Sequence, residues 1–155
     1  MRPPDEAMYA MALYIESLEP APSPHPLDQL ALRGRGVFES EDCAECHPPP
    51  LYTTNELMKP SRVGTDPGLA LRTRKGTGYY KVPSLRGLWY RGLFEHSGSV
   101  GSLEDWFDPR RLKEDYVPTG FRGFGVTHRA VPGHRFGLDL PADDKSALIA
   151  FLLTL

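Results

Sequence analysis

The sequence predicts an all-α domain with long ordered loops. Apolar residues recur at helical spacing in three separate segments, and the alternation typical of a strand is nowhere sustained. The 16 prolines and 15 glycines are many for 155 residues, which favours extensive irregular chain. This length suits one domain with a core of its own.

The first periodic segment covers residues 5–18. Its apolar residues share one helix face: Met8, Met11, Ile15 and Leu18. The Pro-rich stretch EPAPSPHP, residues 19–26, stops this pattern and favours a stiff, extended linker. We therefore expect residues 1–26 to form a helix and a linker that precede the main domain, residues 27–155.

Two further helices are expected within the main domain. The first carries Leu27, Leu30, Ala31, Gly34 and Phe38, with Asp28 near the positive end of its dipole. The second lies in LPADDKSALIAFLLTL at the C-terminus. Pro141 begins its first turn, and the apolar face follows: Ala147, Leu148, Phe151, Leu152 and Leu155.

A short helix and a long irregular segment lie between them. In GSLEDWFDP, Ser102 is a suitable N-cap with Asp105 three residues later, and Asp108-Pro109 ends the helix after little more than one turn. Residues 110–137 show no periodicity. A structureless segment of this size in a compact domain is usually functional, so we expect it to cover a site.

The charge balance argues against two classes of partner. The chain has 18 basic and 20 acidic residues, for a formal net charge of −2. These charges are interspersed, so neither nucleic acid nor an anionic membrane surface is an expected partner. No apolar run is long enough to span a bilayer, and the start MRPPDEAMYAM lacks the features of a secretion signal.

Both cysteines of the chain lie in the motif Cys43-Ala44-Glu45-Cys46-His47. C-x-x-C-H is the pattern of covalent c-type haem attachment. Two thiols one turn apart can bond the two vinyl groups of one porphyrin edge, and the adjacent imidazole then reaches the iron. We expect one haem c, with His47 as proximal ligand and its Nδ1 held by a backbone carbonyl of the following proline-rich turn.

Three alternative roles for the motif stay open. A zinc site needs two more ligands, such as His128 and His134, but these lie far along the chain from Cys46. A thioredoxin-type dithiol requires a βαβ context, which the sequence lacks, and two cysteines inert in the core need no adjacent histidine. Because haem c is attached outside the cytoplasm in bacteria, we expect a periplasmic or otherwise exported protein whose leader or upstream domain is absent from this sequence.

Several segments resemble known haem proteins. GRGVFESEDCAECH resembles the opening of class I cytochrome c, in which this helix crosses the C-terminal helix through an aromatic residue, here Phe151. The further segments resemble the C-terminal haem domain of the bacterial di-haem cytochrome c peroxidase superfamily and its oxygenase-like relatives: CHPPPLYTTN, GYYKVPSLRGLWYRGLFEHSGSVGSLEDWF and GHRFGLDLPADDKSALIAFLLTL. The resemblance implies a class I cytochrome c-like fold for residues 27–155, and residues 1–26 would be the remnant of a preceding haem domain.

The resemblance also implies residue roles. Cys43 and Cys46 would attach the haem, and His47 would be the proximal ligand. Arg86, in VPSLRG, matches an arginine that lies near the haem propionates, where a guanidinium binds carboxylates. The sequence departs from the peroxidases at Glu95, which stands where the distal methionine is often found.

The distal ligand must therefore come from elsewhere. His134, in PGHRFG, resembles a late histidine that ligates the second haem in the oxygenase-like relatives, and it is our expected ligand. The alternatives are His96, which can instead brace its loop, and Met58, which would give a His/Met pair. His128, His25 and an open iron complete the possibilities.

Two functions follow from these possibilities. The first is a mono-haem electron-transfer protein with a six-coordinate iron and a redox partner protein, or a second haem domain or a homodimer joined through the N-terminal helix. The alternative is the catalytic haem domain of a peroxidase- or oxygenase-like di-haem enzyme, with Glu95 and His96 as an acid/base pair beside an open iron. With only one C-x-x-C-H motif, the sequence favours the electron carrier over the enzyme.

Overall fold

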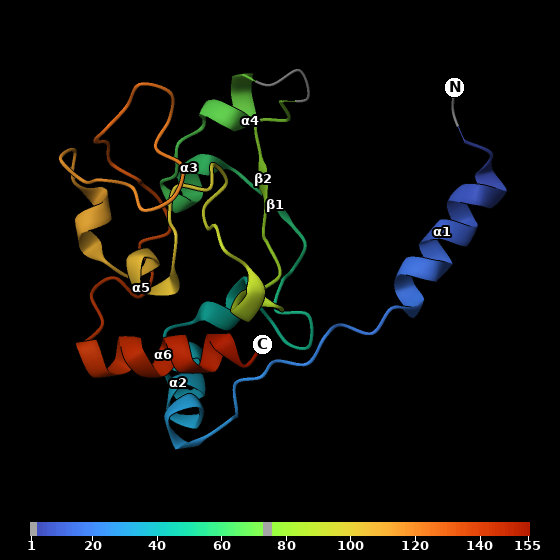
Figure 1. The fold of residues 1–155 in the computed structure, drawn as a ribbon, viewed down its shortest axis with the longest axis horizontal. Coiled ribbons are helices and arrows are strands. Elements are labelled where there is room, and N and C mark those ends of the chain that lie inside the picture. The colour runs from blue at the N-terminus through green and yellow to red at the C-terminus, as the bar shows by residue number, and fades with distance from the viewer. Residues whose placement is uncertain (1–2, 73–75) are drawn as a thin grey trace.

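Two crossing helices form the base of the domain. The structure, a computed structural model, describes residues 3–72 and 76–155. Helix α2 (Gln29–Ser40) and helix α6 (Ala142–Leu153) make the most extensive contact between elements and cross at one end of the molecule (Figure 1). A Cβ placed on Gly34 would lie 1.8 Å from the backbone oxygen of Ala147, so the close approach of the two helices requires glycine there.

Local signals explain where these helices begin. The Asp28 side chain accepts a hydrogen bond of 2.9 Å from the backbone N–H of Ala31, which caps α2. Helix α6 follows Pro141 and carries Asp143 and Asp144 in its first turn, where the helix dipole favours acidic groups. The sequence predictions of both helices are confirmed.

The crossing helices bury an aromatic and aliphatic core. The rings of Phe38, Phe151 and Tyr52 make mutual edge contacts, with centroids 5.4–6.2 Å apart. The remaining buried members of this core come from α6 and from the middle of the chain: Leu88, Leu103, Phe107, Leu148 and Leu152. Cys43 packs against the same core, which ties the C-x-x-C-H segment to the crossing helices.

The middle of the chain consists of short elements joined by loops. They are η1 (Cys43–Glu45), β1 (Leu57–Met58), α3 (Pro60–Val63), α4 (Gly68–Arg72), β2 (Tyr80–Lys81), η2 (Leu88–Tyr90), α5 (Leu103–Trp106) and η3 (Pro109–Leu112). Strands β1 and β2 pair antiparallel, with Leu57 opposite Lys81 and Met58 opposite Tyr80. Helix α5 begins at the expected cap, since Ser102 accepts a hydrogen bond from the backbone N–H of Asp105.

The expectation of an all-α, class I cytochrome c-like fold was wrong. Only about 40 % of the chain is helical, and the structure contains a small antiparallel sheet and long loops. Each strand has only two residues, which is too short for an alternating pattern to appear in the sequence. Tyr80 ties β2 to the segment 66–70: its hydroxyl donates to the Asp66 carbonyl and accepts from the Ala70 N–H.

The segment 110–137 is irregular, as the sequence predicted. After η3 it contains no helix or strand, and backbone hydrogen bonds to distant residues hold it. Examples are Gly120 N–H to Ser99 O at 3.0 Å and His134 N–H to Val63 O at 2.8 Å. In Figure 1 this segment, drawn in orange, lies on the side of the domain opposite α1.

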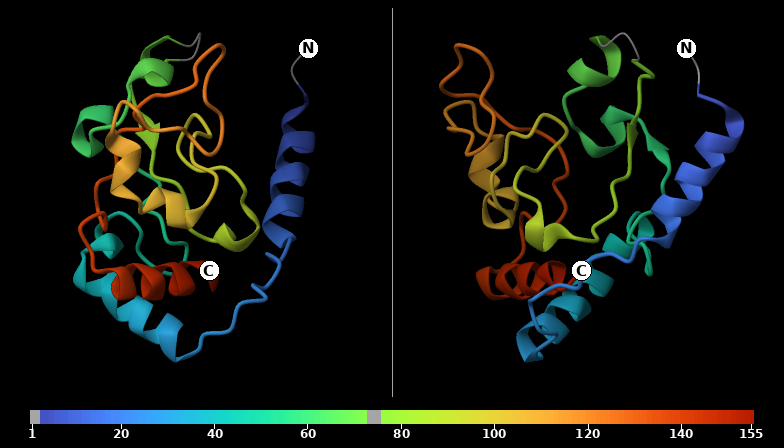
Figure 2. Two further views of the ribbon diagram at one scale, coloured as in Figure 1. Left: turned by 60° about the vertical axis from the view of Figure 1, so that its left-hand side comes forward. Right: turned by 45° about the vertical axis from the view of Figure 1, so that its right-hand side comes forward.

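Helix α1 (Asp5–Ser17) stands outside the body of the domain. None of its residues is buried, and it is separate from the other elements in Figure 1 and in the left-hand view of Figure 2. The linker first contacts the body at Ser23, whose hydroxyl donates to the Leu153 carbonyl at 2.6 Å. In the described part of the chain, no helix has the length and apolar character needed to cross a membrane.

Candidate functional site

The C-x-x-C-H segment forms one tight turn at the end of α2. Asp42 adopts a left-handed conformation with φ 54°, which ends the helix and starts the 3-10 turn η1. The His47 N–H donates to the Cys43 carbonyl at 2.9 Å, so both thiols and the imidazole belong to one helical turn. Cys43 and Cys46 are partly buried and are not joined in a disulfide. Both thiols are therefore free to react, and they lie one helical turn apart.

The Cys43 thiol is protonated at neutral pH. Burial, and next the nearby Glu41 carboxylate, raise its pKa to about 11. Thiol–disulfide exchange enzymes instead lower the pKa of the attacking cysteine. The raised pKa and the lack of a βαβ unit in the described elements argue against a thioredoxin-type dithiol.

His47 is buried and fixed in orientation. It is 8 % exposed, and its Nδ1 lies 3.0 Å from the Tyr52 carbonyl oxygen, to which it donates as the Nδ1–H tautomer. Tyr52 follows the proline-rich turn, so the expected backbone partner is found just beyond those prolines. Burial lowers the His47 pKa, against the opposing effect of the Tyr52 and Pro83 carbonyls. A neutral imidazole with Nδ1–H bound to a carbonyl presents Nε2 as a metal ligand.

His134 lies opposite His47, although 87 positions separate them in the sequence. The centroids of the two rings are 6.5 Å apart, and the ring planes are tilted by 56°. Burial lowers the pKa of His134 to about 4, with further contributions from His47 and Arg111. Its Nδ1 is buried and has no hydrogen-bond partner among the described residues. Two imidazoles that burial keeps neutral thus lie close together, and one of them belongs to the C-x-x-C-H turn.

The distance between the ring centroids is compatible with one transition-metal ion bound by a nitrogen of each ring. An imidazole nitrogen bonds such an ion at about 2.0–2.1 Å, and its ring centroid lies about 1.1 Å further away, so two opposed rings have centroids about 6.3 Å apart. The observed 6.5 Å agrees with this value. His47, the partnerless buried nitrogen of His134 and the two thiols of the C-x-x-C-H turn are the kinds of group that covalent haem c uses, imidazoles for the iron and thiols for the porphyrin edge.

The backbone at His134 is strained. Its φ is 44°, in the left-handed region, and the preceding Gly133 has φ 105°. A residue other than glycine adopts such a φ at a cost of roughly 1–3 kcal/mol, although histidine does so more often than most, and such conformations cluster at functional sites. A Cβ at Gly133 would lie 2.6 Å from the Cβ of Thr65, so this approach to the 63–65 segment also requires glycine.

The structure places the other ligand candidates differently. Met58 is buried in β1, and His25 and His128 are exposed in the linker and the long loop. The His96 side chain is 18 % exposed, binds Glu95 through Nδ1 and stacks on the Tyr80 ring at 4.2 Å. Among the described residues, the ring pair formed by His47 is with His134. The geometry therefore favours His134 over the alternatives.

Arg86 contacts the turn that follows His47. Its Nη1 lies 3.4 Å from the Pro50 carbonyl, a long hydrogen bond, and the residue is exposed. Its own carbonyl accepts from Arg91 Nη2 at 2.9 Å, which holds this part of the chain against the η2 region. The expected contact between Arg86 and haem propionates stays a prediction.

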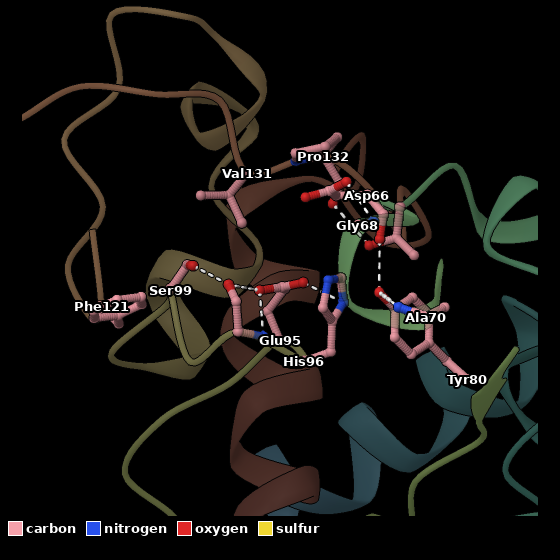
Figure 3. Close-up of polar contacts among 12 residues, drawn as sticks. Asp66, Gly68, Ala70, Tyr80, Glu95, His96, Ser99, Phe121, Val131 and Pro132 are labelled. Carbon is pink, nitrogen blue, oxygen red and sulfur yellow. Dashed lines mark hydrogen bonds and ion pairs between the residues drawn. The ribbon is translucent and has the colours of Figure 1, made fainter. Parts of the chain in front are cut away.

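Glu95 belongs to a series of hydrogen-bonded polar side chains that is largely buried. Figure 3 shows Glu95 between His96 and Ser99, and the Glu95 carboxylate binds His96 Nδ1 and the Ser97 hydroxyl. Ser97 contacts Ser99, which in turn accepts from Arg129. Burial tends to raise the Glu95 pKa, but the hydrogen bonds from His96 and Ser97 outweigh it and lower the pKa. Glu95 is therefore an ionised carboxylate that braces its loop from within.

A structural zinc site has no support. In residues 3–72 and 76–155, no three or more histidine, cysteine or acidic side chains are grouped so that they could hold a metal ion. Four-coordinate zinc would need such a group. Haem does not, because the porphyrin supplies four nitrogen ligands and the protein supplies at most two.

The sequence analysis did not identify three residues that support His47 and His134. The Tyr52 carbonyl orients His47, the Trp106 ring lies 5.4 Å from the His134 ring, and the Arg111 guanidinium binds the His134 carbonyl. Backbone carbonyls leave no trace in side-chain patterns. Arg111 occupies an aperiodic stretch, where an arginine is ordinarily solvated, so no local signal could have identified it.

The comparisons with known proteins found no relative. No family model matches the chain, and neither a curated protein nor a solved structure matches it. The resemblance to di-haem peroxidases and their oxygenase-like relatives therefore depends on the quoted motifs alone, and it stays a prediction.

Proposed function

We propose that this chain binds one haem c covalently through Cys43 and Cys46, with His47 and His134 as axial ligands, and transfers single electrons. The observation that carries the proposal is that the buried imidazole of His134 lies close to that of His47 in the C-x-x-C-H turn, with ring centroids 6.5 Å apart. Haem supplies a one-electron iron couple when it is bound.

The chain's residues would hold the group and limit its chemistry. The Tyr52 carbonyl accepts from His47 Nδ1–H, which fixes the tautomer and increases the basicity of the other nitrogen. His134, as sixth ligand, would exclude water and small substrates from the iron. Two histidine ligands give a lower reduction potential than a His/Met pair of similar burial.

The cellular setting belongs to the same proposal. Covalent attachment of haem c takes place outside the bacterial cytoplasm, so the protein would be periplasmic or otherwise exported. Its partner would be another redox protein, a second haem domain that resembles the other half of the di-haem peroxidases, or a second copy bound through the first helix. The motifs quoted from the sequence support this assignment.

A catalytic haem domain is the alternative. The observation that favours it is the buried Glu95–His96 pair, which joins an ionised carboxylate to an imidazole, two groups that can serve acid/base chemistry. Catalysis also needs a vacant or displaceable position on the iron. Carbon monoxide binding to the reduced protein separates this function from electron transfer.

Covalent attachment is tested by extraction into acidified organic solvent. The wild-type protein, matured in a bacterial periplasm, should retain its haem, whereas Cys43→Ala/Cys46→Ala should release it or contain none. Each single variant should keep one thioether, and its reduced pyridine spectrum should shift to longer wavelength because one vinyl group remains. A wild-type protein without covalent haem would refute the proposal.

The axial ligand is tested by His134→Ala. This variant should stay folded, lose its low-spin spectrum and bind carbon monoxide when it is reduced. His128→Ala, in the same loop but exposed, is the matched control and should behave like wild type. If His134→Ala keeps the wild-type spectrum while His96→Ala loses it, the ligand assignment is wrong.

A further inference from the structure

The long loop contains a buried positive charge with an unusual set of partners. Arg111 is 0 % exposed and is the largest fully buried side chain of the described residues. Its guanidinium makes no ion pair with any carboxylate in the described part of the chain. Because a buried charge is costly without compensation, its partners must be essential to the local structure.

Those partners are three backbone carbonyls. Nε donates to Trp106 O at 2.8 Å, Nη1 to Val131 O at 2.7 Å and Nη2 to His134 O at 2.8 Å. The Val131 N–H donates back to the Arg111 carbonyl at 2.6 Å. One side chain thus joins the end of α5 to both ends of the stretch 131–134.

The same side chain organises the rings around His134. The guanidinium carbon lies 4.9 Å from the centroid of the Trp106 ring, at cation–π distance. The Trp106 ring is in turn 5.4 Å from the His134 ring. Arg111 therefore fixes the backbone of His134 directly and its imidazole through Trp106.

His134 depends on such support because no regular element holds it. It lies outside every helix and strand, with a left-handed φ of 44°. Apart from Arg111, its backbone is held by its N–H bond to Val63 O at 2.8 Å. Without the guanidinium, the strained backbone would be free to relax to a common conformation and turn the ring away from His47.

We infer that Arg111 is the positioning residue for His134: its three-way contact with Trp106, Val131 and His134 holds the imidazole close to that of His47. This inference rests on the proposed function, because that position matters only if His134 is an axial ligand. The planar fork of arginine can reach three carbonyls at once, whereas the single nitrogen of lysine cannot. A lysine should therefore replace the charge but not the positioning.

The test compares Arg111→Gln and Arg111→Lys with Arg110→Gln in the haem-loaded protein. Arg110 is the matched control, because it is adjacent, exposed and paired with Asp108 at the surface. Circular dichroism first identifies the folded variants. Carbon monoxide should leave the wild-type spectrum unchanged, and we expect the folded, reduced Arg111 variants to bind it at a rate at least about tenfold above the upper limit that the wild type sets, the effect of one lost charge-assisted hydrogen bond. Imidazole added to the ferric form should restore the low-spin spectrum.

Hydrogen exchange separates positioning from general structural support. In the Arg111 variants, peptides covering residues 131–138 should exchange faster, while those from α2 and α6 should match wild type. The Arg110→Gln protein should resemble wild type in both measurements. Arg111→Lys keeps the charge, so it supplies the folded variant if Arg111→Gln does not accumulate.

Two results would overturn the inference, and they are distinguishable. If His134→Ala binds carbon monoxide but both Arg111 variants stay low-spin and unreactive, Arg111 does not position the ligand and the proposed function stands. If His134→Ala is also unreactive, the ligand assignment fails, and the inference fails with it.

Discussion

The side chain of His134 shows how much of this site depends on individual residues. Its ring lies close to that of His47 on a left-handed backbone that follows a glycine and is held by hydrogen bonds with Val63 and Arg111. Such a conformation costs roughly 1–3 kcal/mol and persists where the surrounding structure fixes it. These contacts are the residue-level basis of the proposed His47–His134 pair.

Glu95 should stabilise the folded protein at neutral pH and lose this effect in acid. Its folded pKa is lowered, so its contribution is present above the unfolded value of about 4.3 and is lost as pH falls below it. Glu95→Gln should cost about 1–3 kcal/mol at pH 7, since the charge-assisted bonds to His96 and Ser97 weaken. Urea unfolding between pH 3 and 7 measures both effects.

The control for this prediction is Glu39→Gln, an exposed glutamate of α2 in a surface pair with Arg35. Such pairs contribute little, so this variant should follow the wild-type pH profile. If Glu95→Gln also follows that profile, the buried carboxylate does not stabilise the loop through its charge.

Individual site residues differ in how well the sequence identified them. Cys43, Cys46 and His47 lie within five consecutive residues, so their spacing alone predicts haem attachment. His134 was selected from its motif, and its proximity to His47 is a tertiary contact that no spacing encodes. Arg111 could not be predicted, because its partners are backbone carbonyls contributed by two other segments.

At the scale of elements, the crossing of α2 over α6 depends on one glycine. Gly34→Ala should destabilise the domain at the upper end of the about 1–3 kcal/mol typical of overpacking, because the new Cβ would meet the rigid backbone of Ala147. Urea unfolding of the haem-loaded protein measures the loss.

Gly36→Ala is the matched control in the same helix. A Cβ there has no atom within 4 Å, and alanine is the better helix former by about 1 kcal/mol, so this change should be neutral or stabilising. Equal effects of the two substitutions would mean that the helices do not cross at Gly34.

The elements that the sequence predicted are those with local signals. Apolar periodicity marks α2 and α6, and the Ser102 cap marks α5; the structure has all three at the expected positions. The one-turn helices α3 and α4 were missed because neither has the Ser-x-x-Asp cap that marks α5. The all-α expectation failed because the two-residue strands are too short to leave an alternating pattern in the sequence.

At the scale of the molecule, α1 is independent of the domain that carries the site. Deletion of residues 1–20 retains the Ser23 contact with Leu153, so the unfolding free energy should change by less than about 0.5 kcal/mol and the visible spectrum should not change. Far-UV circular dichroism should lose the signal of one helix. A stability loss above about 1 kcal/mol would show that α1 packs on the body.

The most direct test of the whole account is the visible absorption of the periplasmically matured protein, ferric and then reduced, with and without carbon monoxide. The His47–His134 pair predicts one covalently bound haem per chain with sharp low-spin bands that carbon monoxide does not change. A high-spin ferric form that binds the gas readily would contradict the electron carrier and favour the catalytic alternative. A protein without haem would contradict both.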